Sequence, residues 1–230
     1  MRDTREPAKR EVRRAWSYVK WRLSNAVSVA RYGRSAPRFR ELCYLKPSRR
    51  LFGLRRKTVR LEESSSVLGG CWDMDQVNVT DLPAIRQCLL HWVEGLSWEQ
   101  SGAFGRMLEE LKLHGEVDGC RTFEDVVARY RRLDAVYAHA KATGRLRTSA
   151  ERSDASHRQR EHGGIVFHFD RHGLPVFGGY GQHRLAIAIA LNLELIPAQV
   201  GVVHKCGVRN WRANTEPPPA RAAAADIQVG

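Results

Sequence analysis

A group of residues suited to binding an anion occupies the stretch Gly178-Gly179-Tyr180-Gly181-Gln182-His183-Arg184. The residues that follow, 185–193, are apolar on every face when drawn as a helix, and such a helix is buried. Its first turn nevertheless carries an imidazole and a guanidinium, where free N–H groups and the helix dipole already create positive potential. A bound phosphate or carboxylate would make that arrangement favourable. The pattern predicts an anion site at Gly178, Gly179, Gly181, Gln182, His183 and Arg184.

The alternative for this stretch is a hairpin-exit turn. Its glycines would then serve backbone conformation alone, because glycine adopts positive φ without steric cost. Arg184 would reach solvent or a buried carboxylate.

A second glycine turn, Gly69-Gly70, leads into Trp72, Asp73 and Asp75. A bound nucleotide would bring a divalent cation, and Mg²⁺ takes oxygen ligands such as carboxylates. Asp73 and Asp75 are the candidate ligands, with Asp170 behind them, and simple turn capping is the alternative. Trp72 is a candidate to stack on a base or sugar, although a Trp in such a position more often belongs to the core.

His168, Asp170 and His172 alternate along a predicted hairpin, so they could share one face and hold a metal. The same residues also suit a solvated hairpin tip. The sequence has no Gly-x-Ser-x-Gly elbow, no His-Glu-x-x-His helix and no complete P-loop lysine motif that would indicate another enzyme class.

The chain has 230 residues, 43% of them hydrophobic, enough for one elaborated domain with its own core. Lys and Arg total 38 against 25 acidic residues, so the net charge is +13, which favours polyanionic partners. A basic but merely solvated surface is the alternative. Five scattered cysteines form no CxxC pair, and no run is long enough to span a bilayer. We therefore expect a reduced, cytoplasmic protein.

Helical spacing of apolar residues marks several elements. Residues 12–30 predict a basic amphipathic helix, which would pack on the domain or, less commonly, lie on an anionic membrane. Three further helices are predicted at Pro83–Val93, at Glu99–Leu113 and from Thr122 onward, where Thr122-Phe123-Glu124-Asp125 suggests a capped start.

Alternating or continuous apolar runs mark the strands. They lie at 58–61, 165–169, 175–177 and 196–203, with a turn at 170–173. We divide the chain into a basic N-terminal helix and connector (1–57), a domain (58–205) with a helical insertion at about 83–142, and a low-complexity, disordered tail (206–230).

The order of strand, Asp-x-x-Gly turn, strand, glycine loop, His-Arg, apolar helix and Ile-Pro strand resembles the ParB/sulfiredoxin-like family. The residues that carry the resemblance lie between Ile165 and His204: Asp170, Gly173, Gly178, Gly179, His183, Arg184, Leu185, Ala188, Ile196 and Pro197. Gly69-Gly70-Cys71-Trp72-Asp73 looks like the Gly-x-Trp-Asp motif of an uncharacterised ParB-like group. The resemblance implies an α+β fold with a mixed sheet.

The resemblance also implies a nucleotide phosphate, from ATP or CTP, held by Gly179, His183 and Arg184. This chain departs from the family pattern at two points, and each departure excludes one of the family's known functions. Gln182 stands where sulfiredoxins have their catalytic cysteine, so sulfinic-acid reduction is not expected. Only residues 205–230 follow the core, so the helix-turn-helix region of segregation-type ParB proteins is not expected either.

Two classes of function follow. The first is binding of a nucleotide or another phosphate ligand, with nucleotide hydrolysis or phosphoryl transfer left open. The second is a non-catalytic basic module that binds nucleic acid or an anionic membrane surface through Arg49, Arg50, Arg55, Arg56 and Lys57. A ParB-like nuclease is a weaker alternative.

Overall fold

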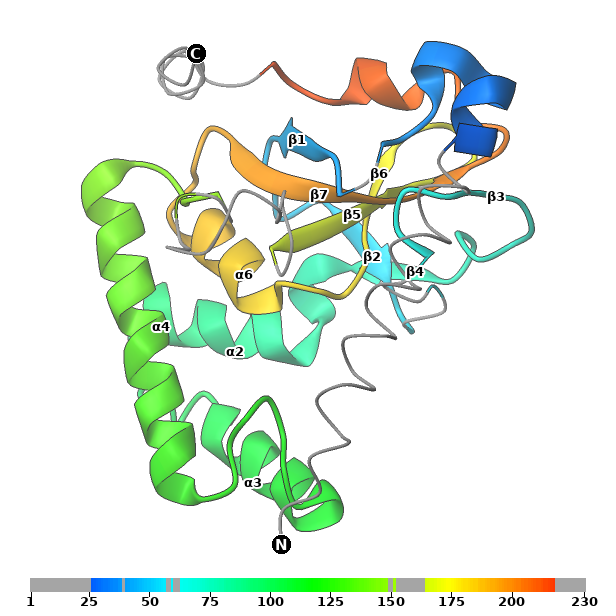
Figure 1. Ribbon diagram of the computed structural model, residues 1–230. Helices are drawn as coiled ribbons and strands as arrows, with labels where there is room; N and C mark the ends of the chain where they lie inside the picture. The colour runs from blue at the N-terminus through cyan, green and yellow to red at the C-terminus, as the bar shows by residue number, and fades with distance from the viewer. Residues whose placement is uncertain are drawn as a thin grey trace, which may run out of the picture.

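The structure is a computed structural model that describes residues 26–38, 40–56, 59, 63–148, 151 and 164–217. It combines a sheet with a helical layer, which confirms the predicted α+β class (Figure 1). Residues 26–32 are helical. In chain order the other elements are η1 (Gly33–Ser35), β1 (Leu42–Leu45), β2 (Phe52–Leu54), β3 (Val67–Leu68), β4 (Gln76–Asn78), η3 (Val79–Asp81), α2 (Pro83–Trp92), α3 (Ala103–His114), α4 (Phe123–Thr143), β5 (Ile165–Phe169), β6 (Pro175–Phe177), α6 (Gln182–Ala190), β7 (Ile196–His204) and η4 (Trp211–Asn214).

The strands of the described chain form one seven-stranded mixed sheet in the order β1-β7-β5-β6-β2-β4, with β3 also paired to β7. β7 is parallel to β5 and β3, and β2 is parallel to β6. The β1–β7, β5–β6 and β2–β4 pairs are antiparallel. Every residue of β5 and β7 is buried, as expected for parallel strands covered on both faces.

The α6 helix connects β6 to β7 and lies against one face of the sheet, together with α2 (Figure 1). Its residues from Leu185 to Ile189 are all buried, so the apolar helix predicted from the sequence is confirmed. The main core lies between these two helices and the sheet. The opposite face carries a smaller apolar cluster of Leu54, Val59, Val176 and Val202, with Leu68 and Trp72 packed against it.

The three helices predicted before the hairpin are confirmed. The α4 helix starts with a capping box, in which Thr122 Oγ1 accepts from the Asp125 N–H and the Asp125 carboxylate accepts from the Thr122 N–H. The α3 helix lies beyond α2, farther from the sheet, whereas α4 runs past α2 and α6 along one margin of the molecule (Figure 1).

Asp134 of α4 ties the helical layer together. Its Oδ1 accepts from Trp92 Nε1 at 3.0 Å and lies 3.2 Å from His91 Nε2, and its Oδ2 accepts from Trp98 Nε1 at 2.9 Å. The His91 ring also stacks on Trp98, with centroids 3.8 Å apart. One carboxylate therefore accepts from two indoles and contacts an imidazole, all from α2 and the loop after it.

The structure corrects the boundary predicted at residues 57 and 58. The segment expected to be a connector contributes β1 and β2 to the sheet. β1 pairs with the first half of β7, from Leu42 opposite Gln199 to Leu45 opposite Ile196. These strands are only four and three residues long and lie among arginines and prolines, so charge and composition conceal them in the sequence.

The tail was predicted to be disordered from residue 206, but its first twelve residues are structured. Residues 206–217 form turns and η4, in which Trp211 is buried against Phe169 with ring centroids 4.9 Å apart. Arg212 donates to Glu41 at 2.6 Å and lies over the Trp211 ring. The segment is therefore fastened to the residues just before β1.

Several predicted features fall outside the described residues. They are the helix from 12 to 25, the strand positions Thr58, Arg60 and Leu61, and the tail after Pro217. Among the residues described, no helix combines the length and the apolar character that crossing a membrane requires.

Replacement of Asp134 by alanine should lower the free energy of unfolding by about 1–3 kcal/mol, because two partly buried indole N–H groups lose their acceptor. Urea denaturation would measure the change. Glu109→Ala, at an exposed position on α3, is the matched control and should stay within about 0.5 kcal/mol of wild type. Equal effects of the two substitutions would show that Asp134 has no organising role.

Candidate functional site

The glycine turn links the end of β6 to the start of α6, next to the beginning of β5. Gly181 caps α6 with φ 80°, and a Cβ there would lie 2.7 Å from the Gly164 carbonyl oxygen. Gly179 also has a positive φ of 82°. The α6 helix has no side-chain N-cap hydrogen bond and no acidic residue in its first turn. Its first N–H groups therefore lack both an intrahelical acceptor and a capping side chain.

His183 turns towards α4. Its ring meets the Tyr130 ring edge-on with centroids 6.0 Å apart, and its buried Nε2 has no hydrogen-bond partner. Burial, with the guanidinium charges of Arg129 and Arg106, lowers the pKa of His183 to about 4. The imidazole is therefore neutral at pH 7 and offers a hydrogen bond rather than a charge.

Arg184 extends in another direction. Its Nη2 donates to the carbonyl oxygen of Arg147, beyond the end of α4 at Thr143. Tyr130 lies about 20 Å from that end along the helix axis. His183 and Arg184 thus contact well-separated parts of the helical layer, and in this structure they do not converge on one point. Gln182 closes the turn by donating to the Gly179 carbonyl at 3.2 Å.

The position of His168 on β5 explains why residue 178 is a glycine. A Cβ at Gly178 would lie 2.6 Å from His168 Nε2, and one at Gly201 would lie 2.2 Å from His168 Nδ1. The Nδ1 accepts from the Val202 N–H at 2.8 Å, so the ring proton is on Nε2. Burial lowers the pKa of His168 to about 4. Two glycines thus make room for a buried, neutral imidazole in the sheet.

The carboxylates of the second turn are both engaged by arginines. Asp73 is buried and accepts from Arg171 Nε at 2.9 Å, Arg171 Nη2 at 2.7 Å and the Arg171 N–H at 3.0 Å. This contact lowers the pKa of Asp73 to about 2. Asp75 accepts from Arg55 Nε at 2.9 Å. A cation would have to displace these arginines, so the metal site at Asp73 and Asp75 stays a prediction.

Trp72 packs on the face of the sheet opposite α6. Its ring lies 5.6 Å from that of His168 and 6.0 Å from that of His204, beside the small apolar cluster. The structure therefore does not bring Trp72 together with the first turn of α6. Its packing matches the core alternative.

The alternating residues of the β5–β6 hairpin do not form a cluster. His168 is buried in the sheet, whereas His172 is exposed at the turn. Asp170 Oδ1 accepts from the His172 and Leu174 N–H groups at 2.8 Å and so caps the turn. In the part of the chain that the structure describes, no group of three or more His, Cys, Asp or Glu side chains could hold a metal ion.

The basic residues next to β2 lie at its two ends. β2 is parallel to β6, with Gly53 opposite Phe177. Arg55 and Arg56, which follow β2, therefore lie at the same end of the strands as the glycine turn that follows β6. Arg49 and Arg50 come before β2, at the other end of the strand. Lys57 is outside the described residues. The four described residues of this group therefore do not form one continuous patch.

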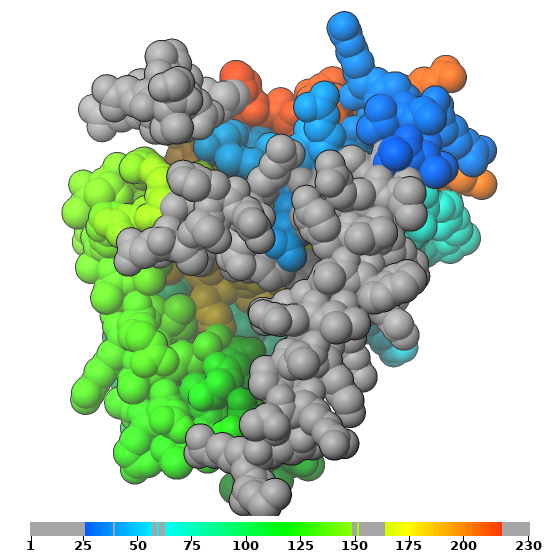
Figure 2. Space-filling model, in the orientation of Figure 1, coloured from blue at the N-terminus to red at the C-terminus, as the bar shows by residue number. Residues whose placement is uncertain are grey.

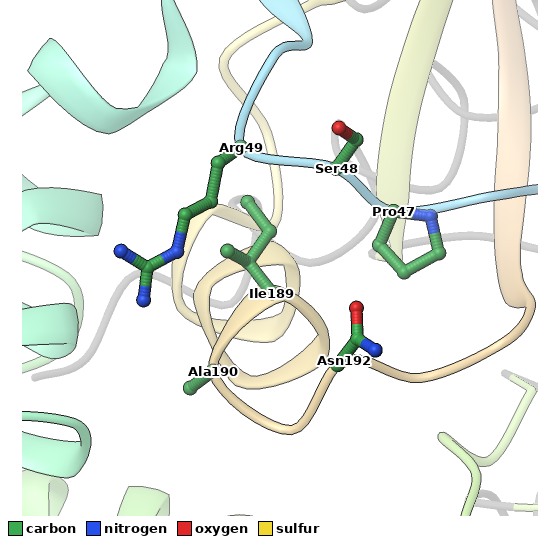
Figure 3. Close-up of a pocket in the computed structure, with 6 residues that line it drawn as sticks. All are labelled: Pro47, Ser48, Arg49, Ile189, Ala190 and Asn192. Carbon is green, nitrogen blue, oxygen red and sulfur yellow. The ribbon is translucent and has the colours of Figure 1, made fainter.

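A cavity of about 330 Å³ lies at the opposite end of α6 from the glycine turn. Pro47, Ser48 and Arg49 line it from the segment before β2, and Ile189, Ala190 and Asn192 line it from the end of the helix (Figure 3). The guanidinium of Arg49 is near a helix C-terminus, where a cation stabilises the helix dipole.

Comparison with protein families, curated proteins and solved structures found no match to this chain. The resemblance to ParB/sulfiredoxin-like proteins therefore stays a prediction.

Sequence reasoning missed two contributors to the site. Arg106 and Arg129 approach His183 from α3 and α4, and helical periodicity does not reveal such a contact. The sequence predicts His168 as a metal ligand or as part of a solvated hairpin tip, and not as a buried imidazole within the sheet. Gly201 within a buried strand was a usable signal, since a glycine in a strand often marks the close approach of another group.

A double-mutant cycle would test the packing of Gly178 on His168. Gly178→Ala should lower the free energy of unfolding by about 1–3 kcal/mol, because the new methyl group overlaps the imidazole. In a His168→Ala background the same change should cost clearly less, measured by urea denaturation. Additive effects would contradict the contact.

The free energy of unfolding should fall as the pH is lowered from about 6.5 to about 4. In that range the unfolded chain protonates His168 and His183, whereas the folded chain keeps both neutral. The loss should be about 2 kcal/mol for each histidine between about pH 7 and about pH 5.

Urea denaturation at the two pH values would measure this loss. His183→Gln should remove about half of it, whereas His172→Gln, at an exposed position, should leave it unchanged. An unchanged pH dependence in His183→Gln would contradict the buried neutral state.

Proposed function

We propose that the protein binds a phosphate-bearing ligand, with a nucleotide as the first candidate, at the glycine turn and first turn of α6. One observation carries the proposal. A buried helix begins there without a side-chain cap or an acidic residue, in surroundings positive enough to contribute to the lowered pKa of His183. An anion would accept hydrogen bonds from the N–H groups of that turn and balance the positive charge.

Further cations at the same end of the strands support this proposal. Parallel pairing of β2 with β6 brings Arg55 and Arg56 out beside the turn. Arg55 is paired with Asp75, whereas Arg56 is exposed and forms no ion pair with any described residue. A ligand with more than one negative group would therefore find cations on two sides of the turn.

The residues of the turn would have different roles. The glycines allow the backbone to approach the ligand closely, and the N–H groups of the first turn donate to it. His183 would add a neutral hydrogen bond through its unpartnered Nε2. Arg184 would exchange its hydrogen bond to the Arg147 carbonyl for one to the ligand.

The proposal extends to binding and not to a reaction. Nucleotide-bound Mg²⁺ is held largely by phosphates and water with one or two carboxylates, and Asp73 and Asp75 are both paired with arginines. Hydrolysis or phosphoryl transfer would also need a group that positions the attacking oxygen.

Binding of a nucleic acid is the second candidate. Its specific support is that Arg49, Arg50 and Arg56 are exposed and form no ion pairs within the described chain. Backbone phosphates would bind such side chains with a steep dependence on salt.

Thermal unfolding with ATP, CTP or GTP, each with and without Mg²⁺, would test the first candidate. A nucleotide at about 100 times its Kd should stabilise the wild type by roughly 2.7 kcal/mol. Arg184→Ala should lose most of this stabilisation, because it removes the one guanidinium in the first turn of α6.

Arg49→Ala is the matched control, since it removes the same charge at the other end of α6. It should respond like the wild type. The proposal fails if no nucleotide stabilises the wild type. If instead Arg49→Ala weakens binding of an oligonucleotide while Arg184→Ala does not, the second candidate is favoured.

A further inference from the structure

A group of cationic and polar side chains joins the first turn of α6 to the helices α3 and α4. The Tyr130 ring of α4 meets the His183 ring edge-on with centroids 6.0 Å apart, and the Tyr130 hydroxyl lies 3.5 Å from Arg106 Nη2. Besides burial, the charges of Arg129 and Arg106 lower the pKa of His183 and that of Asp118 raises it, so all three lie near the ring. α3 and the start of α4 form the lower end of the molecule in Figures 1 and 2, away from the sheet.

Arg129 is the guanidinium of this group with a nitrogen that lacks an acceptor. Its Nε is buried without a hydrogen-bond partner, as is His183 Nε2. An arginine Nε is always a donor, and a buried donor without an acceptor costs about 1–3 kcal/mol. Arg106 differs, because its Nε donates to Gln87 Oε1 and its Nη1 donates to Glu110 Oε1, both at 2.9 Å. Arg129 therefore has a hydrogen-bonding capacity that the chain does not use.

Asp118 holds the other nitrogens of the Arg129 guanidinium. Its carboxylate accepts from Nη2 at 2.7 Å, and its carbonyl oxygen accepts from Nη1 at 3.3 Å. Asp118 and Gly119 both have positive φ, and Val117 and Cys120 on either side of them pair through their backbones. This is the tight turn that an Asp-Gly pair favours. It presents the Asp118 carboxylate, 56% exposed, at the surface between α3 and α4.

The carboxylate fits Arg129 incompletely. Nε and Nη2 form an edge of the guanidinium that binds an oxyanion through two parallel hydrogen bonds. Asp118 takes only Nη2 of this edge and leaves Nε without a partner. A phosphate group has three acceptor oxygens and can accept from both nitrogens. An ion pair with so exposed a carboxylate also contributes little to stability, so a phosphate can replace it at low cost.

We propose that the ligand held at the first turn of α6 carries a second phosphate group, which displaces Asp118 and accepts from Nε and Nη2 of Arg129. The inference rests on the proposed function, since the first phosphate is the one that α6 binds. It narrows the ligand to a molecule with at least two linked phosphates, such as pyrophosphate or a nucleoside di- or triphosphate. Asp118 competes with the second phosphate and thereby lowers the affinity for the ligand.

Isothermal titration calorimetry of the full chain with pyrophosphate and with inorganic phosphate would test the inference. The wild type should bind pyrophosphate more tightly than phosphate. Asp118→Asn keeps the turn, because Asn-Gly also favours it, and should tighten pyrophosphate binding by ~10-fold by removing the competing charge. Binding of phosphate should change by no more than about 2-fold in this variant. Arg129→Lys keeps the charge but not the paired donors, and should weaken pyrophosphate binding.

Glu116→Gln is the matched control for Asp118→Asn. It removes the same charge from the same connection between α3 and α4, but Glu116 pairs with Arg121 at 2.7 Å and not with Arg129. Its affinities for pyrophosphate and for phosphate should both stay within about 2-fold of wild type. Circular dichroism of each variant would confirm that it is folded.

The inference is overturned if Asp118→Asn binds pyrophosphate no more tightly than Glu116→Gln does. It is also overturned if the wild type binds pyrophosphate no more tightly than phosphate, or if Asp118→Asn tightens the binding of both equally. These results leave the proposed function standing, because that function depends on the response of the wild type and Arg184→Ala to nucleotides. A wild type that no nucleotide stabilises overturns the proposed function and this inference together.

Discussion

The parallel pairing of β5 with β7 is the constraint on which the rest of the structure depends. Two parallel strands need a crossover connection, and here β6 and α6 supply it. The crossover buries α6 against the sheet and places the first turn of α6 beside the carboxyl end of β6. The glycine turn is thus a consequence of sheet topology, because the chain must leave β6 and enter a buried helix within a few residues.

The same pairing explains the buried polar groups of the sheet. His168 and Val202 lie on adjacent strands at an irregularity in the register, and the imidazole accepts the N–H there. Glycines at 178 and 201 keep the space around the ring open. A buried imidazole that stays neutral satisfies a backbone donor without bringing a charge into the core.

The excess positive charge of the chain is partly used within the fold. Arg171 binds Asp73, Arg55 binds Asp75, and Arg212 binds Glu41, so these guanidinium groups link loops to the sheet. The positive surroundings of His183 are different, because they meet at the start of a helix that lacks an acidic residue. This contrast separates arginines that hold the fold together from the place where we propose that a ligand binds.

The sequence by itself determined the elements whose signals are local. The periodic helices α2, α3 and α4, the capped start at Thr122, the β5–β6 hairpin and the apolar α6 all follow from side-chain spacing and turn chemistry. The tertiary structure alone decided that β1 and β2 join the sheet, because short strands are stabilised by partners far away in the chain. It also decided that His183 and Arg184 diverge and that Asp73 binds Arg171, since the direction and partner of a side chain depend on what packs around it.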